Sequence, residues 1–345
     1  MRRSAAELYR CPYTGEPLAV EIDTADGSHV ISGQLVATSG RVYRIDDGIP
    51  FLLDLQQESL SVEERKENDY YQASSQSYDA IMDWVYKSFY EDEETVRSKV
   101  IDLLELSPTS RVLETGAGTC RDSAHILRRL GPDGELYAQD LSPEMLTLGR
   151  KRVEESKTGR GPRPRTEFFV GNAAHLPFPD RCFDAAFHFG GINLFTDRRA
   201  AIAEMARVVC VGGKVVFGDE GVAPWLRQTL HGEILMNSNK LYRFEPPTEF
   251  LPESARDAAV RWFLGNAYYM VDFRVGDGPP RLDLDLPIVG RRGGTHRTRY
   301  YGALEGVTVQ AKALAEKAAR DSGLTLHEWL DRAVRAAAAG QAERT

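Results

Sequence analysis

The stretch Arg111-Val-Leu-Glu-Thr-Gly-Ala-Gly-Thr-Cys120 constrains the fold more than any other part of this sequence. The apolar pair Val112-Leu113 is typical of a buried strand, and the small residues at 116–118 predict a tight turn. The pattern from Arg121 to Leu130, ended by Gly131, predicts a helix. Glycines let the backbone approach a ligand, and the free N–H groups of a helix start can donate to it. The stretch therefore predicts a strand, a glycine turn and a helix that together bind a nucleotide-like ligand.

A glycine turn of this kind occurs in proteins that bind NAD, FAD or S-adenosylmethionine (SAM). A dinucleotide fingerprint needs a third glycine at position 121, where this chain has Arg121. Glu114, at the end of the strand, suits the cationic methionyl part of SAM better than a diphosphate. About 24 residues after Gly116, the segment 135–140 predicts a second strand that ends in Asp140, placed to bind both ribose hydroxyls. These features favour SAM over NAD.

Four segments in order carry a resemblance to a known family: VLETGAGTC from residue 112, AQDLSPEML from 138, GNAAHLPFPDRCFDAAF from 171 and EMARVVCVGGKVVF from 204. Together they resemble the class I SAM-dependent methyltransferases, closest in pattern to the ubiquinone/menaquinone C-methyltransferase branch, over roughly residues 70 to 275. The resemblance implies an α/β, Rossmann-like, seven-stranded sheet whose last strand is antiparallel. It also implies SAM as the cofactor.

The resemblance assigns a part of SAM to each segment. The methionine moiety falls to Glu114 and the glycine turn, the ribose to Asp140, and the adenine to Asn172 and Ala173. The full set of expected cofactor-binding residues is Tyr78, Glu114, Thr115, Gly116, Ala117, Gly118, Asp140, Leu141, Asn172 and Ala173. The chain departs from the family at Cys120, where glycine is usual, and at Asn172, where aspartate is usual.

The segment that follows the fourth expected strand, 182–188, is expected to border the reaction chamber. In an open α/β sheet, ligands lie beyond the carboxyl ends of the strands, which places His188 and Asn193 there, with Asp219 and Glu220 at the end of the fifth strand. His188 is the candidate general base because an ordinary histidine pKa of about 6.5 allows it to accept a proton near neutrality. The alternative is that its ring only packs or bonds to the backbone.

Residues 1–58 predict a small β module. Its segments CPYTGEPL and GRVYRIDDGIPFLL resemble the zinc-ribbon-derived domain that precedes some bacterial methyltransferases, including one that modifies ribosomal RNA. In the metal-bearing version Thr14 would be a cysteine, and a second cysteine pair would lie near residues 37–39. We therefore expect no zinc and no other metal.

The methyltransferase core is expected at 59–275, with a helical lid before the first strand and a substrate-recognition insertion at 221–258. The tail, 276–345, predicts a basic glycine-rich loop at 290–299, a short strand at 307–310 and two helices. Strand, helix and helix is the order of ribbon-helix-helix modules, which pair between two chains. The tail therefore favours a homodimer.

The net charge of −8 and the pI near 5.5 argue against nucleic acid as a bulk electrostatic partner. No apolar run approaches a membrane span, and the first residues lack the apolar region of a signal peptide, which favours a cytoplasmic protein. The function that the sequence favours is methyl transfer from SAM to carbon or oxygen of a small molecule. Two alternatives stay open: an RNA methyltransferase, and a SAM-binding regulatory protein without turnover.

Overall fold

The structure, a computed structural model, describes residues 1–53, 79–155, 163–291, 293–301 and 307–342. The chain divides into two compact units, Met1–Pro280 and Arg281–Thr345. The domain boundary predicted at residue 58 lies outside the described residues.

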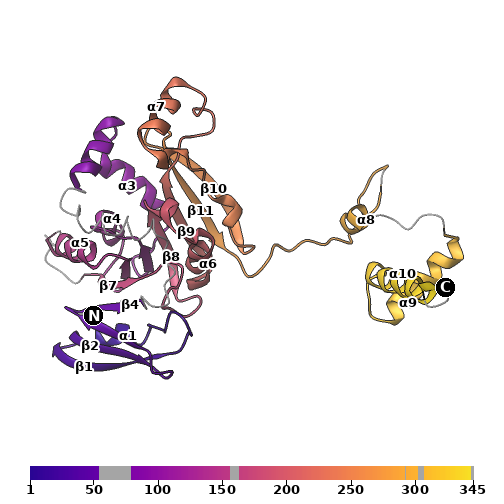
Figure 1. The fold of residues 1–345 in the computed structure, drawn as a ribbon, viewed down its shortest axis with the longest axis horizontal. Helices are drawn as coiled ribbons and strands as arrows, with labels where there is room; N and C mark the ends of the chain where they lie inside the picture. Colours follow the sequence, from indigo (N-terminus) through magenta and orange to yellow (C-terminus); the bar gives the residue numbers. More distant parts are fainter. Residues whose placement is uncertain (54–78, 156–162, 292, 302–306, 343–345) are drawn as a thin grey trace. The chain divides into compact units, whose positions relative to one another are not determined.

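A mixed sheet runs through the whole of the first unit (Figure 1). In the described residues it has eleven strands in the order β1-β2-β3-β4-β7-β6-β5-β8-β9-β11-β10. The strands are β1 Leu18–Asp26, β2 His29–Ala37, β3 Val42–Asp46, β4 Ile49–Leu52, β5 Arg111–Thr115, β6 Glu135–Asp140, β7 Arg165–Gly171, β8 Phe183–Phe189, β9 Val209–Glu220, β10 Ala255–Phe263 and β11 Tyr268–Val275. β11 runs antiparallel to β9, as predicted for the last strand.

The described core has seven strands, β5 to β11, but they do not form a separate sheet, because the N-terminal strands β1 to β4 continue the same sheet. β4 pairs in parallel with β7, with Phe51 opposite Val170 and Leu52 opposite Gly171. Without β4, the last four residues of β7, which are buried, would present unpaired N–H and C=O groups at an open edge. The N-terminal module thus covers an edge that the core leaves exposed.

Helices cover both faces of the sheet (Figure 1). Residues 79–88 form a helix ahead of the first core strand. The further elements of the first unit are α1 Arg3–Ala6, α3 Glu93–Asp102, α4 Arg121–Leu127, α5 Pro143–Glu155, α6 Arg198–Val208, α7 Leu230–Ser238 and the 3-10 turns η1 Ile192–Leu194, η2 Lys240–Arg243 and η3 Thr248–Phe250. α3, α4 and α5 lie on one face and α6 lies on the other.

Side-chain caps explain where several of these helices begin. Asp92 accepts from the Thr95 N–H before α3, Asp197 from the Ala200 N–H before α6, and Thr229 from the Gly232 N–H before α7. Each cap satisfies one of the backbone donors that a helix start leaves free.

The second unit contains α8 His296–Tyr301, α9 Val309–Asp321 and α10 Leu326–Ala342. The prediction of a strand at 307–310 is wrong, because the Thr308 hydroxyl accepts from the Ala311 N–H and starts α9. The predicted basic loop is helical from His296 onward. No described helix combines the length and the apolar content that a membrane crossing requires.

Candidate functional site

The predicted glycine turn joins β5 to α4 and has the conformation that its glycines suggest. Gly116 and Gly118 have φ angles of +63° and +52°, in the left-handed region that favours glycine. A Cβ atom on Gly116 would lie 2.8 Å from Cε1 of His188. Cys120 also lies in this region, at φ 59°, so its position explains why the family usually has glycine there.

Asp140 holds the glycine turn in place from the end of β6. Its Oδ2 accepts from the Gly118 N–H at 2.8 Å, and its Oδ1 accepts from the Ser142 N–H at 2.9 Å. Burial raises the pKa of Asp140, and the backbone donors partly oppose this. The structure therefore brings together three sequence-predicted features: the turn, the acidic strand end and the start of α5.

Gln139 is a residue that the sequence reasoning missed. Its Oε1 accepts from the Gly116 N–H at 3.2 Å, and its Nε2 donates to the Gly171 carbonyl at the end of β7. The side chain is 3% exposed and links the carboxyl ends of three strands. No pattern in the neighbouring sequence marks Gln139 for this role, since its partner Gly171 lies 32 residues further along the chain.

Glu114 is also buried, with 2% exposure. Its Oε2 accepts from the Ser123 hydroxyl in the first turn of α4 at 2.5 Å. Burial is the largest cause of a raised pKa of about 8, and the nearby Asp122 adds to it. The carboxyl group is therefore largely protonated at neutral pH until a cation approaches.

If Glu114 contacts the cationic part of SAM, as the sequence predicts, this pKa makes the binding of SAM pH-dependent. A cation beside Glu114 favours the carboxylate, so binding below about pH 8 must release a proton, and the affinity should rise by up to about tenfold per pH unit toward that value. Isothermal titration calorimetry in buffers of different ionisation enthalpy would measure both the affinity and the proton release. Glu114→Gln is the control: its affinity should be lower and should lack this pH dependence, and an unchanged slope would contradict the assignment.

Arg121, at the place of a third glycine, connects the turn to the helices in front of it. It donates to Asp79 Oδ1 at 2.9 Å, to Asp83 Oδ1 at 2.8 Å and to both carboxylate oxygens of Glu93. Arg152 of α5 also bonds Asp79. The sequence reasoning used Arg121 only to argue against NAD and missed this role.

The remaining predicted cofactor residues lie at strand ends next to the turn, except Tyr78, which lies outside the described residues. Thr115 is fully buried, and its hydroxyl contacts His188 Nδ1 at 3.2 Å. Asn172 Oδ1 accepts from the Ala174 N–H at 2.9 Å, which orders the loop after β7. Ala173 is buried and Leu141 is half-buried.

His188 is 0% exposed beneath the turn. Its Nδ1 donates to the Thr115 carbonyl at 2.8 Å, so Nε2 is the basic nitrogen, and Nε2 has no hydrogen-bond partner among the described residues. Burial lowers the pKa of His188. The role of general base stays a prediction, and the contact with Gly116 gives the ring a structural role as well.

The end of β9 places two carboxylates with different surroundings. Asp219 accepts from the Gly191 N–H at 3.1 Å and from the Asn193 N–H at 2.7 Å, so it anchors the loop after β8. Glu220 Oε1 accepts from the Tyr268 hydroxyl at 3.4 Å, and its carboxyl group also bonds with that of Asp219. Burial and the neighbouring Asp219 raise the pKa of Glu220. A raised pKa makes a carboxyl group a stronger proton acceptor than an ordinary glutamate.

The comparisons with known proteins concern the same region. Residues 112–213 match a family described as "Methyltransferase domain". A ubiquinone/menaquinone biosynthesis C-methyltransferase of Xanthomonas oryzae is 33% identical over 158 residues, which are 44% of this chain and 61% of the relative. A demethylmenaquinone methyltransferase of Bacillus mycoides is 29% identical over 153 residues, with the same two shares. The chain thus spans 61% of the length of these relatives.

The solved structures to which this chain is similar share little sequence identity with it. The YcgJ protein of Bacillus subtilis is 16% identical, with a TM-score of 0.41, and the match covers 54% of this chain and all of that one. A phosphoethanolamine N-methyltransferase of Haemonchus contortus, in complex with SAM, is 12% identical with a TM-score of 0.46, over 68% of this chain and 63% of that one.

Proposed function

We propose that this chain, which carries a class I SAM-dependent methyltransferase domain, transfers a methyl group from SAM to carbon or oxygen of a small molecule. The observation that supports this most is the glycine turn held by Asp140, because it combines left-handed glycines, a carboxylate at the next strand end and a buried Glu114. The relatives are named for ubiquinone and menaquinone biosynthesis, so quinol-type rings are the first acceptors to test.

Methyl transfer needs no covalent intermediate with the protein, because the sulfonium of SAM already activates the methyl group. The protein has to place the methyl carbon and the acceptor in line and exclude water. In this proposal Glu114 and Gly116–Gly118 hold the methionine part, Asp140 the ribose, and Asn172 with Ala173 the adenine. His188 and Glu220 are the candidate proton acceptors.

Incubation of the protein with labelled SAM and an extract of host metabolites, followed by mass spectrometry, tests the proposal. We expect a product heavier than its precursor by one methylene, together with S-adenosylhomocysteine. Asp140→Ala serves as the control and, at a SAM concentration well below the raised Kd of this variant, should form far less of both. A protein that binds SAM saturably, yet forms no S-adenosylhomocysteine with any extract, would instead be the regulatory alternative.

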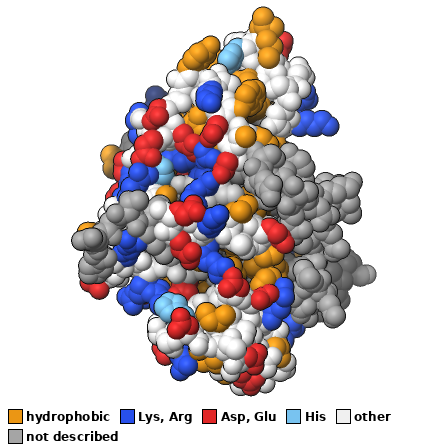
Figure 2. All heavy atoms as spheres, turned by 90° about the vertical axis from the view of Figure 1, so that its left-hand side faces the viewer, with side chains coloured by type: hydrophobic (Ala, Val, Ile, Leu, Met, Phe, Trp, Pro, Cys, Tyr) orange, Lys and Arg blue, Asp and Glu red, His pale blue; other side chains and the backbone are white. Residues whose placement is uncertain are grey.

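RNA is the second class of acceptor, and the described surface gives it little support. On the face shown in Figure 2, the described basic and acidic side chains are interspersed, so these residues form no continuous basic groove there. If the purified protein methylated RNA but no small molecule, RNA would replace a small molecule as the proposed acceptor.

Self-association through the tail rests on the two helices alone, since the strand that ribbon-helix-helix pairing needs is absent from 307–310. Leu314 on α9 and Val334 on α10 are 68% and 57% exposed within this unit, so apolar surface is open to a second copy. Light scattering after size-exclusion chromatography should show a dimer that becomes a monomer on deletion of residues 303–345. A monomer in both cases would contradict the proposal.

A further inference from the structure

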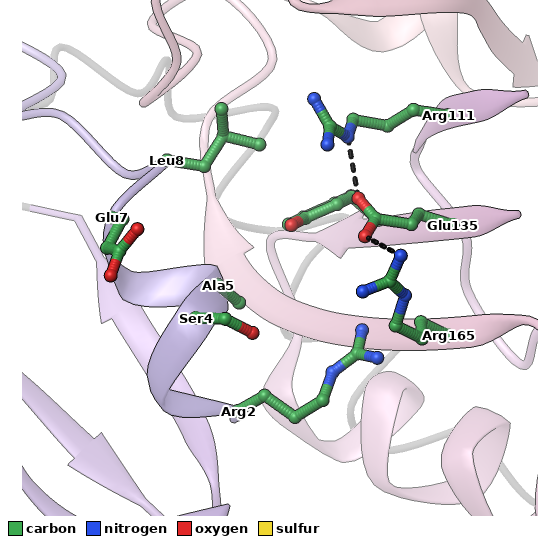
Figure 3. Close-up of a pocket in the computed structure, with 9 residues that line it drawn as sticks. Arg2, Ser4, Ala5, Glu7, Leu8, Arg111, Glu135 and Arg165 are labelled. Atoms are coloured by element: carbon green, nitrogen blue, oxygen red, sulfur yellow. Dashed lines mark hydrogen bonds and ion pairs between the residues drawn. The ribbon is translucent and has the colours of Figure 1, made fainter. Parts of the chain in front are cut away.

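A cavity of about 350 Å³ lies at the end of the sheet opposite to the glycine turn, where β5, β6 and β7 begin. α1 forms one wall, and the first residues of the three strands form the other (Figure 3). Small-molecule sites usually occupy roughly 300–1,000 Å³. The cavity therefore has room for more than a simple ion.

Three strand-start residues form a row along this cavity because they are in register. Arg111 pairs with Glu135 across β5 and β6, and Glu135 pairs with Arg165 across β6 and β7. Arg111 Nε lies 2.6 Å from one oxygen of Glu135, and Arg165 Nη2 lies 3.0 Å from the other. Arg111 also donates through Nη1 to the Cys182 carbonyl. The single carboxylate of Glu135 thus pairs with two guanidinium groups, so Arg111, Glu135 and Arg165 together carry a net positive charge.

Arg2 adds a third guanidinium from the segment before α1. Its Nε donates to Glu167 Oε1 at 2.6 Å, and its side chain is 16% exposed. Figure 3 shows the guanidinium groups of Arg2 and Arg165 directed to the same space. The other acid of the lining, Glu7, points its carboxylate away from the three arginines (Figure 3). Glu135 and Glu167 are the two carboxylates that pair with these three guanidinium groups, so one positive charge is left without a partner among them. This excess positive charge favours an anion in the cavity.

We propose that this cavity binds a phosphate group, free or as the monoester of a small metabolite, through Arg2, Arg111 and Arg165. The planar guanidinium fork matches the oxygens of phosphate and can donate two hydrogen bonds to it. The phosphate would bridge α1 to β5 and β7, and so would stabilise the junction between the N-terminal module and the core. This site is separate from the cofactor turn, because the two lie at opposite ends of β5.

Thermal unfolding of the full chain tests this binding. Potassium phosphate should raise the Tm above that in potassium chloride of equal ionic strength, and the rise should grow with concentration as mass action requires. Glycerol phosphate is the second arm: a larger rise than with inorganic phosphate identifies a monoester as the ligand, and an equal rise identifies the free ion. If neither phosphate nor glycerol phosphate raises the Tm above its value in chloride, the proposal is overturned.

Variants locate the effect in the cavity. Arg165→Gln should weaken phosphate binding by about tenfold or more, because it removes a charged donor. Ser4 is an exposed residue of α1 that lines the cavity. Ser4→Glu should also weaken phosphate binding, because the new carboxylate repels the anion without changing the sheet. This variant tests the proposal even if Arg165→Gln does not fold. Lys151→Gln, which removes an exposed charge on α5, should respond to phosphate as the parent does. An unchanged response in both cavity variants would contradict the assignment, and SAM affinity should stay constant in all three.

Discussion

Replacing Asp140 with alanine should weaken SAM binding by about a hundredfold. Hydrogen bonds to a charged group contribute about 1.5–3 kcal/mol, which corresponds to roughly ten- to a hundredfold in affinity. Asp140 also accepts from the N–H groups of Gly118 and Ser142, so its loss frees the turn as well as the proposed ribose contact. The upper end of the range is therefore expected. Calorimetric titration with SAM and with S-adenosylhomocysteine would measure the change.

Asp197→Ala is a matched control for this experiment. Asp197 also accepts a backbone N–H, that of Ala200, but it does so at the start of α6, on the other face of the sheet. Its loss should cost about 1 kcal/mol of stability, as for other helix caps, with SAM affinity unchanged. If Asp140→Ala binds SAM as tightly as the parent does, the assignment of Asp140 to the ribose is wrong.

Replacing Tyr9 with alanine should lower the free energy of unfolding by about 3–5 kcal/mol, the usual cost for a large buried aromatic side chain. Tyr9 is 0% exposed, and its ring lies 5.7 Å from that of Phe169 and 5.4 Å from that of Phe178. It comes from the segment before β1 and packs under β6 and β7, so it joins the N-terminal module to the core. Urea denaturation followed by circular dichroism would measure the loss.

Two further tyrosine variants separate packing from other effects. Tyr90→Ala changes a side chain that is 98% exposed and should alter stability by no more than about 0.5 kcal/mol. Tyr9→Phe should be neutral or stabilising, because the Tyr9 hydroxyl is buried without a hydrogen-bond partner in the described part of the chain. A Tyr9→Ala protein as stable as the parent would show that the module is not part of the core.

The elements that the sequence predicted are those whose signals are local. Alternating or continuous apolar residues placed β5, β6 and β8, and Asp197 placed the start of α6 within one residue. Gly265 and Asn266 placed the hairpin between β10 and β11, and both have positive φ. Each of these features depends on a few adjacent residues, so a pattern in the chain is enough to reveal it.

The candidate site was predicted only in part, because the side chains that support the glycine turn contact residues far away in the sequence. The turn and Asp140 have characteristic residue types at a characteristic spacing. Gln139 reaches Gly171, and Arg121 reaches Asp79 and Glu93, only once the strands and helices are packed. Nothing in their local sequence distinguishes them from ordinary polar residues.

The sequence by itself determined the glycine turn, the acidic strand ends and the antiparallel hairpin, because backbone sterics and short-range periodicity are properties of neighbouring residues. Only the tertiary structure decided that β4 would extend the core sheet and that Tyr9 would fill the core beneath β6 and β7. Pairing at a sheet edge and burial of an aromatic ring depend on which distant surface is open to accept them. A strand with a weak local signal forms where a partner edge exists.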